Sequence, residues 1–301
     1  MHFSLSSSFN IIFLLTIFGF SVESCNKFEG SQTIPAYLKI DTTTLQTNYY
    51  TQGSNTHNIT DAWIYVNDQL LGVFELPALL PVLQEGENKL EIRAGIKING
   101  IGATRAPYPF YVPYTLSSFN FIPGSIQLVK PSTKYSDIPV FAWIEDFESA
   151  GLSLVSTAHS DTNIYKTTPY NNPEAWLSQN SAFSGMVVLD QGHKNFEIAT
   201  LSAYVLPRNG APVILELDYK CDFPFMVGMF ASENGSVVSI PLVGVNPSEK
   251  WNKIYINLGP NVTDHTQASN FKIYFQSMIN QEERATFYFD NIKLIYRPNQ
   301  S

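Results

Sequence analysis

Short stretches in which apolar residues occupy every second position recur along the whole chain. The longest covers residues 90–98, where one leucine, one alanine and three isoleucines alternate with charged residues and glycine. A period of two places alternate side chains on opposite faces of a β-strand, so one face of each such segment is buried. Aromatic residues, which favour strands, make up 14% of the sequence. The pattern predicts an all-β protein.

The 301 residues exceed the usual size of one domain, and the strand patterns fall into two groups. Residues 34–130 have the hairpin-and-meander layout of an immunoglobulin-like or transthyretin-like sandwich, with a tight turn predicted at Asn67-Asp68. Residues 131–139 read as a linker, and a second sandwich is expected over 140–297. The stretch from Thr60 to Asn99 resembles the N-terminal part of uncharacterised Bacteroidota lipoproteins, a resemblance that implies no activity.

The N-terminus has the features of an export signal. An apolar run from Phe9 to Phe20 is too short to span a bilayer and suits a signal peptide. Val22-Glu23-Ser24-Cys25 resembles the lipobox of bacterial lipoproteins, which implies that residues 1–24 are removed, that Cys25 is lipidated and that residues 25–33 form a tether. The alternative is a secretory signal cut near Ser24, with Cys25 left as an ordinary thiol.

The second sandwich resembles a known group of domains. The segments EDFE, WNKIYINL, FKIYF and FYFDNIKLI are similar to jelly-roll domains of the carbohydrate-binding-module and galactose-binding-like type. In the last segment the apolar positions change from odd to even numbers at Asp290-Asn291, which predicts a β-bulge of one extra residue. Because jelly rolls carry many unrelated functions, the resemblance implies a fold and no particular ligand.

The same resemblance implies a structural calcium ion. Such domains bind calcium with acids from their first and last strands, and Asp146, Glu148 and Asp290 stand at those places. The alternative is that Asp290 hydrogen-bonds the backbone of the bulge while the other two acids remain in water.

Two groups of aromatic residues are candidates for ligand or partner binding. The segment 106–114 contains three prolines, which favour a stiff extended path, and its aromatic residues are Tyr108, Phe110, Tyr111 and Tyr114. These rings either contact a sugar or protein partner or pack against the edge of the sandwich. Trp176 follows a loop-like Asn-Asn-Pro sequence and is the best single candidate for stacking on a glycan, whereas Trp143 and Trp251 lie within strand patterns and are expected in the core.

Charge and motifs exclude several functions. The net charge of -8 disfavours nucleic acid as a partner. If Cys25 is lipidated, Cys221 has no cysteine to pair with, and its apolar neighbours predict a buried thiol. The sequence lacks the metalloprotease, nucleophile-elbow, phosphate-loop and dinucleotide motifs. A pair of catalytic carboxylates is a less favoured option, with four candidates: Glu145, Glu148, Glu174 and Glu216.

These observations predict a non-catalytic protein anchored by lipid to the outer membrane, exposed at the cell surface. Its expected role is a binding or scaffold subunit of an outer-membrane protein assembly. The alternative is a surface lipoprotein that binds carbohydrate, and a glycoside hydrolase comes third. No cofactor is expected apart from the calcium ion.

Overall fold

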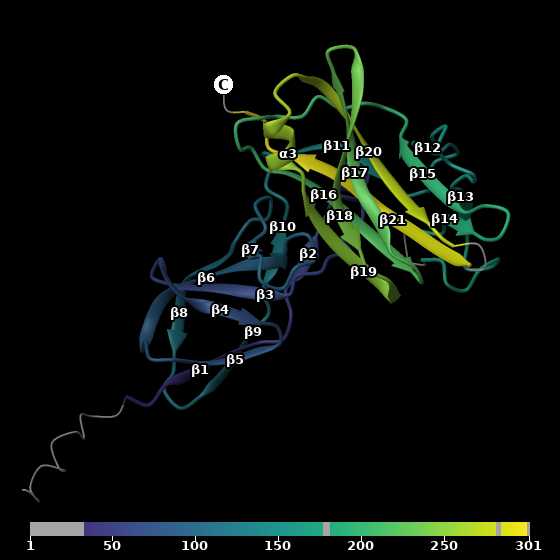
Figure 1. The fold of residues 1–301 in the computed structure, drawn as a ribbon. Coiled ribbons are helices and arrows are strands. Elements are labelled where there is room, and N and C mark those ends of the chain that lie inside the picture. The colour runs from purple at the N-terminus through teal and green to yellow at the C-terminus, as the bar shows by residue number, and fades with distance from the viewer. Residues whose placement is uncertain (1–32, 177–180, 281–283, 300–301) are drawn as a thin grey trace, which may run out of the picture.

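The computed structural model describes residues 33–176, 181–280 and 284–299 and confirms a nearly all-β protein. Two groups of sheets, one built from β1–β10 and the other from β11–β21, lie side by side (Figure 1). The predicted signal peptide, and with it Cys25 and most of the tether, lies outside the described residues. Within the described ranges no helix has the length and apolarity needed to cross a bilayer.

The first group of sheets is a small sandwich. One sheet has the order β5-β1-β9, and the facing sheet has the order β4-β3-β6-β7, with β8 also paired to β6. The Asn67-Asp68 turn between β3 and β4 is confirmed, since both residues have the positive φ that a two-residue hairpin turn needs. The bounds are β1 Ala36–Ile40, β3 Asp61–Val66, β4 Gln69–Glu75, β5 Ala78–Val82, β6 Gly86–Lys97, β7 Arg105–Pro107, β8 Tyr114–Phe121 and β9 Ile126–Val129.

The second group of sheets is the predicted larger sandwich. One sheet has the order β13-β14-β21-β16-β19 with β11 also paired to β21, and the other has the order β12-β15-β20-β17-β18. Every pair in these two sheets is antiparallel. The bounds are β11 Val140–Glu145, β12 Leu154–Ser156, β13 Tyr165–Thr167, β14 Ser184–Leu189, β15 Asn195–Thr200, β16 Val213–Cys221, β17 Phe225–Glu233, β18 Ser236–Val245, β19 Ser248–Asn257, β20 Ala268–Met278 and β21 Ala285–Tyr296.

The predicted bulge in β21 is confirmed. Opposite it, Glu216 pairs with Lys293 and Asp218 pairs with Asp290, so β21 uses one residue more than β16 over this stretch. Asn291 has a φ of 48°, a left-handed value that asparagine tolerates better than most residues. The bulge keeps Phe287 and Ile292 buried on either side of it although their sequence numbers differ in parity.

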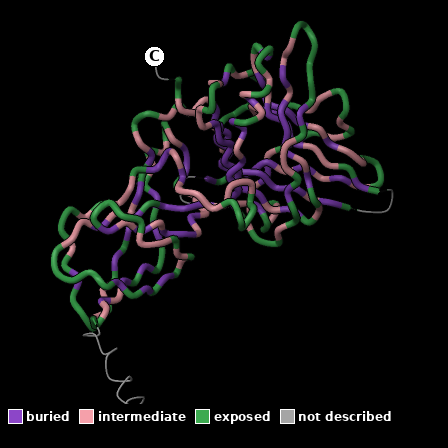
Figure 2. Tube along the Cα trace, turned by 60° about the vertical axis from the view of Figure 1, so that its left-hand side comes forward, coloured by how far each residue is buried: buried purple, intermediate pink, exposed green. Residues whose placement is uncertain are grey.

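A third apolar cluster joins the two sandwiches. It combines Tyr108, Phe110 and Tyr135 from the first part with Tyr255 and Ile295 from the second. The segment 131–139 therefore does more than connect, because it contains a strand and one of the largest buried side chains. Figure 2 shows that buried segments continue from one part into the other. The remaining elements are β2 Thr44–Gln46, which pairs with β10 Ser132–Lys134, and two short helices, α2 Tyr49–Gln52 and α3 Gly259–Asp264.

Candidate functional site

Four charged side chains lie buried on the outer face of the second sandwich. Glu216 and Asp218 project from β16, Lys253 from β19 and Lys293 from β21, and each is at most 5% exposed. Their neighbours in sequence, such as Leu217, point to the opposite face and into the apolar core. Charges are buried here because loops of the first sandwich cover this part of the sheet.

Glu216 and Lys253 are held by hydrogen bonds from both sandwiches. The hydroxyls of Tyr108 and Tyr135 donate to Glu216 Oε1 over 2.6 and 2.8 Å. Lys253 Nζ donates to Asp218 Oδ1 at 3.2 Å and to Thr56 Oγ1 at 3.1 Å. Lys253 Nζ also lies 3.6 Å from Glu216 Oε2, so one ammonium group faces two carboxylates.

Lys293 is the second cation of this cluster. Its Nζ donates to the Ser54 carbonyl at 2.7 Å and to the Tyr135 hydroxyl at 3.3 Å. Burial lowers the pKa of Lys293 to about 8, although the nearby Glu216 acts in the opposite direction. The cluster thus combines a close ion pair with a lysine that loses its proton at a lower pH than an exposed lysine does.

A pocket opens beside this cluster, where the two sandwiches meet. The rings of Trp176 and Trp251 form one wall, with centroids 5.4 Å apart and planes at 77°. Trp251 Nε1 donates to the Glu174 carbonyl at 2.9 Å, which fixes the orientation of its indole. The cavity volume is about 370 Å³. This tryptophan pocket is lined by Asn55, Thr56, His57, Trp176, Asp218, Trp251, Asn252 and Lys253.

The tryptophan pocket combines apolar ring surface with hydrogen-bonding groups. The Nε1 atom of Trp176 and the Oδ2 atom of Asp218 are buried and have no hydrogen-bond partner among the described residues. Burial lowers the pKa of His57, and the nearby Lys253 adds to this effect, so the imidazole is neutral at pH 7. Such a pocket suits an uncharged ligand that has both apolar and hydroxyl-bearing faces.

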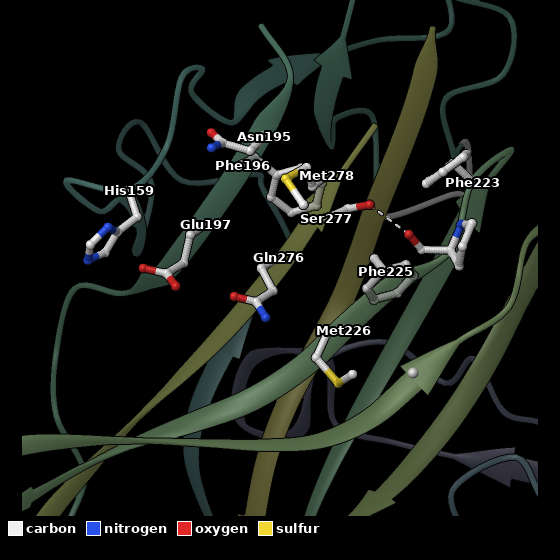
Figure 3. A pocket seen from close by; sticks show the side chains of 12 residues that line it. His159, Asn195, Phe196, Glu197, Phe223, Phe225, Met226, Gln276, Ser277 and Met278 are labelled. Carbon is white, nitrogen blue, oxygen red and sulfur yellow. Dashed lines mark hydrogen bonds between the residues drawn. The ribbon is translucent and has the colours of Figure 1, made fainter. Parts of the chain in front are cut away.

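A shallower groove runs over the outer face of the opposite sheet. Its cavity volume is about 490 Å³, and its lining comes from β15, β17, β18 and β20 and their loops. Figure 3 shows Glu197 and Gln276 projecting from neighbouring strands, with Met226 and His159 beside them. Thr157 Oγ1 donates to Glu197 Oε1 at 2.5 Å, which holds that carboxylate in place.

The structure gives different surroundings to Trp143, Trp176 and Trp251. Trp176 lies in the pocket, and Trp143 is in the core as expected, at 5% exposure. The prediction that Trp251 belongs to the core was wrong, because its ring lies partly exposed at the pocket wall. Trp251 sits near the start of β19 on the outer face, where alternation within the strand could not show which protein segment covers it.

The aromatic segment 106–114 does not form an external binding surface. Tyr108, Phe110 and Tyr111 are 3%, 0% and 8% exposed, and they pack in the cluster between the sandwiches. Tyr114 packs against the core of the first sandwich. The predicted ligand or partner contacts of these four residues are therefore replaced by internal packing, and the scaffold hypothesis loses one of the observations that motivated it.

The three predicted calcium ligands each accept hydrogen bonds from the protein. Asp146 Oδ2 accepts from the Tyr49 hydroxyl at 2.9 Å, and Glu148 Oε1 accepts from two backbone N–H groups at 2.8 Å. Asp290 Oδ1 accepts the N–H of Asn291, as the alternative interpretation expected, and burial raises its pKa well above the usual range. Among the described residues no group of three or more acidic, histidine or cysteine side chains could hold a metal ion. The structure does not assemble these acids into a coordination set.

The candidate catalytic carboxylates and Cys221 are held by contacts within the fold. Glu145 Oε2 accepts from the Ser153 N–H at 2.7 Å, and Glu174 pairs with Lys220. Glu216 is enclosed by tyrosines. Cys221 is buried as predicted, and burial raises the pKa of its thiol to about 11.

Sequence reasoning missed most of the pocket. One signal was available, because in β16 acids at 216 and 218 alternate with leucines at 215 and 217. Charged residues in an otherwise apolar strand indicate a partner on the polar face. His57 and the two residues before it gave no such signal, because they belong to a loop of the other sandwich.

Comparisons with known proteins give only distant likenesses. No family model matches the chain, and no curated protein matches it. A family 22 xylan-binding domain has 10% identity and a TM-score of 0.35 over 54% of this chain and 97% of its own. A family 11 carbohydrate-binding module from Clostridium thermocellum, in complex with a mixed-linked tetrasaccharide, has 16% identity and a TM-score of 0.35 over 55% of this chain and all of its own.

One further likeness is to a larger protein. In a Clostridium thermocellum xylanase 10B structure that joins a carbohydrate-binding module to a catalytic module, the match has 13% identity and a TM-score of 0.36, and it spans 55% of this chain but only 30% of the xylanase chain. Identities and TM-scores this low do not indicate what the present chain binds.

Proposed function

We propose that this protein binds carbohydrate and that the tryptophan pocket is its binding site. The observation that carries the proposal is the pair of indoles, Trp176 and Trp251, beside hydrogen-bonding atoms that have no partner within the part of the chain that the structure describes. A sugar ring presents C–H groups on its faces and hydroxyls around its edge. Indole rings contact the first, and carboxylate, amide and N–H groups bind the second.

The polar groups of the pocket are suited to a neutral sugar. Asp218 is already paired with Lys253 at 3.2 Å, so the pocket offers donors and acceptors without a free net charge. Asn55 and Asn252 add amide groups, each of which donates and accepts. A charged ligand would have to compete with the existing ion pair, whereas a hydroxyl can bind to either partner.

The proposed setting is the bacterial envelope. The lipobox-like sequence supports a lipid on Cys25, and residues 26–35 then join the anchor to β1. A glycan-binding protein held in this way would capture polysaccharide at the outer membrane. Mass measurement of the protein isolated from membranes tests the lipid, and cleavage by protease added to intact cells tests surface exposure.

Binding of the full chain to a glycan array tests the main proposal. Trp176→Ala removes one of the two rings in the pocket wall, and we expect at least a roughly fivefold loss of affinity, since contact with a ring contributes about 1 kcal/mol or more. Gln276→Ala in the groove of Figure 3 is the matched control and should leave binding unchanged. Thermal unfolding of each variant checks that the fold is kept.

The outcome distinguishes the two surfaces. If Gln276→Ala abolishes binding and Trp176→Ala does not, the chain binds carbohydrate in the groove and the assignment of the pocket is wrong. If the unchanged protein binds no glycan on a broad array, carbohydrate binding itself is refuted.

A further inference from the structure

The outer face of the β5-β1-β9 sheet is apolar and exposed. On this face Leu79 and Leu128 flank Lys39 from the two neighbouring strands, and Pro81 and Ile126 flank Tyr37. Leu79, Leu128 and Ile126 are 57%, 49% and 64% exposed. The alternate residues of β1 are buried beneath them, and β5, with the sequence ALLPV, carries apolar residues on both faces although only one face is covered.

Three more exposed aliphatic residues belong to the segments at one end of the sheet. Leu83 follows the residue that pairs with the start of β1, and Ile34 directly precedes Pro35. Ile122 belongs to the turn that hydrogen-bonds back to the Pro35 carbonyl through Gly124. These three side chains are 64%, 63% and 48% exposed. We refer to them, together with Tyr37, Lys39, Leu79, Ile126 and Leu128, as the apolar face.

The apolar face is placed close to the N-terminal attachment. In Figure 1 the β5-β1-β9 sheet lies on the side of the first sandwich that is turned away from the second. Ile34 is only nine positions after Cys25, and even a fully extended chain of that length spans about 30 Å. Whatever surface holds Cys25 is therefore within about one domain diameter of this face.

We infer that the apolar face lies on the lipid bilayer to which the N-terminal segment attaches the protein. The inference rests on the membrane attachment proposed for Cys25 and is independent of carbohydrate binding. Contact of six exposed aliphatic side chains with the membrane would remove apolar surface from water, which is the main source of interfacial binding.

The polar residues of the face fit a membrane interface better than a second copy of the chain. A tyrosine among aliphatic residues is common at the level of the lipid headgroups, and a lysine there extends its amine toward phosphates. Lys39 lies between Leu79 and Leu128, and its Nζ is 3.3 Å from the exposed Asp41 carboxylate. In a two-fold dimer through this face, two lysines would approach one another in a desolvated contact.

Photo-cross-linking to lipid tests the inference. The full chain, isolated from membranes with its own N-terminal attachment, is reconstituted into phosphatidylcholine vesicles that contain a diazirine-labelled phospholipid. Mass spectrometry then maps the cross-links. We expect them on peptides that carry Tyr37, Ile126 and Leu128. Val205 and Val237, which are 76% and 69% exposed on the second sandwich, provide internal controls and should carry none.

A double variant makes the test quantitative. Leu79→Ser with Leu128→Ser should reduce cross-linking of the face roughly tenfold while thermal unfolding stays unchanged, because both side chains are already exposed. Val237→Ser is the matched control and should have no effect. Cross-links spread evenly over both sandwiches, or absent from the apolar face, would overturn the inference. So would a dimer in sedimentation that the double variant converts to monomer, since the face would then bind a second copy.

Discussion

The two faces of the β16-containing sheet differ although they are built from the same strands. The inner face carries Leu215, Leu217 and Ile256, which belong to the apolar core between the two sheets. The outer face carries Glu216 and Lys293, which are equally buried but are held by hydrogen bonds from the first sandwich. The buried fraction of a residue therefore does not tell which side chain its position requires. Positions on the inner face require apolar side chains of the right volume, and positions on the outer face require side chains that match specific hydrogen-bond partners.

The largest expected effect tests whether a substitution on the outer face lowers the free energy of unfolding as much as one on the inner face. Glu216→Ala leaves the Lys253 ammonium with one carboxylate instead of two and removes the acceptor of two tyrosine hydroxyls. We expect a loss of about 3–5 kcal/mol in the free energy of unfolding, the cost of breaking a buried ion pair. This overlaps the range expected for Leu217→Ala on the inner face, about 2–5 kcal/mol. Chemical denaturation measures both.

Glu216→Gln is the control for the charge. It keeps an acceptor for Tyr108 and Tyr135 and has nearly the same volume, so its effect isolates the ion pair. A loss below about 1 kcal/mol in Glu216→Ala would contradict the proposed equivalence of the two faces.

The second prediction concerns pH and Lys293. Its folded-state pKa of about 8 is below the unfolded value of 10.5, so the unfolded chain binds more protons between these values. The free energy of unfolding should therefore rise as the pH increases from 8 toward 10. The full effect of such a shift is roughly 3 kcal/mol. Lys293→Met lacks this group, so the free energy of unfolding of the unchanged protein should rise relative to that of this variant as the pH increases. A difference that stays constant from pH 7 to pH 9.5 would contradict the assignment.

The smallest effect concerns a single hydroxyl. Tyr108→Phe removes one of the two donors to Glu216 and leaves the ring packing in place, so we expect a loss of about 1.5 kcal/mol. Tyr50→Phe, at a residue that is 95% exposed, is the control and should change nothing. If the two variants unfold at the same denaturant concentration, the hydrogen bond contributes no stability.

The fold was more accessible from the sequence than the site. Alternation over residues 90–98 predicted the long strand β6, and the change of phase at Asp290-Asn291 predicted the bulge, because both depend only on neighbours within one strand. The sequence could not show that Tyr108 and Tyr135 meet Glu216, since these residues are 108 and 81 positions apart from it. Trp176 was found because its surroundings are loop-like, and Trp251 was misplaced because its strand pattern resembles that of the core.

The extra residue at Asn291 has a consequence for how such a chain can change. If every residue were kept but the strand ran without a bulge, strict alternation after Phe289 would turn Lys293 toward the dry interior and Leu294 toward the tyrosines. Deletion of Asn291 itself would restore plain alternation and leave the later side chains on their present faces, whereas deletion of a residue after the bulge would exchange the surroundings of every side chain that follows it. A relative could therefore lose the bulge residue alone, but any other change in the length of β21 would require several substitutions at the C-terminal end together.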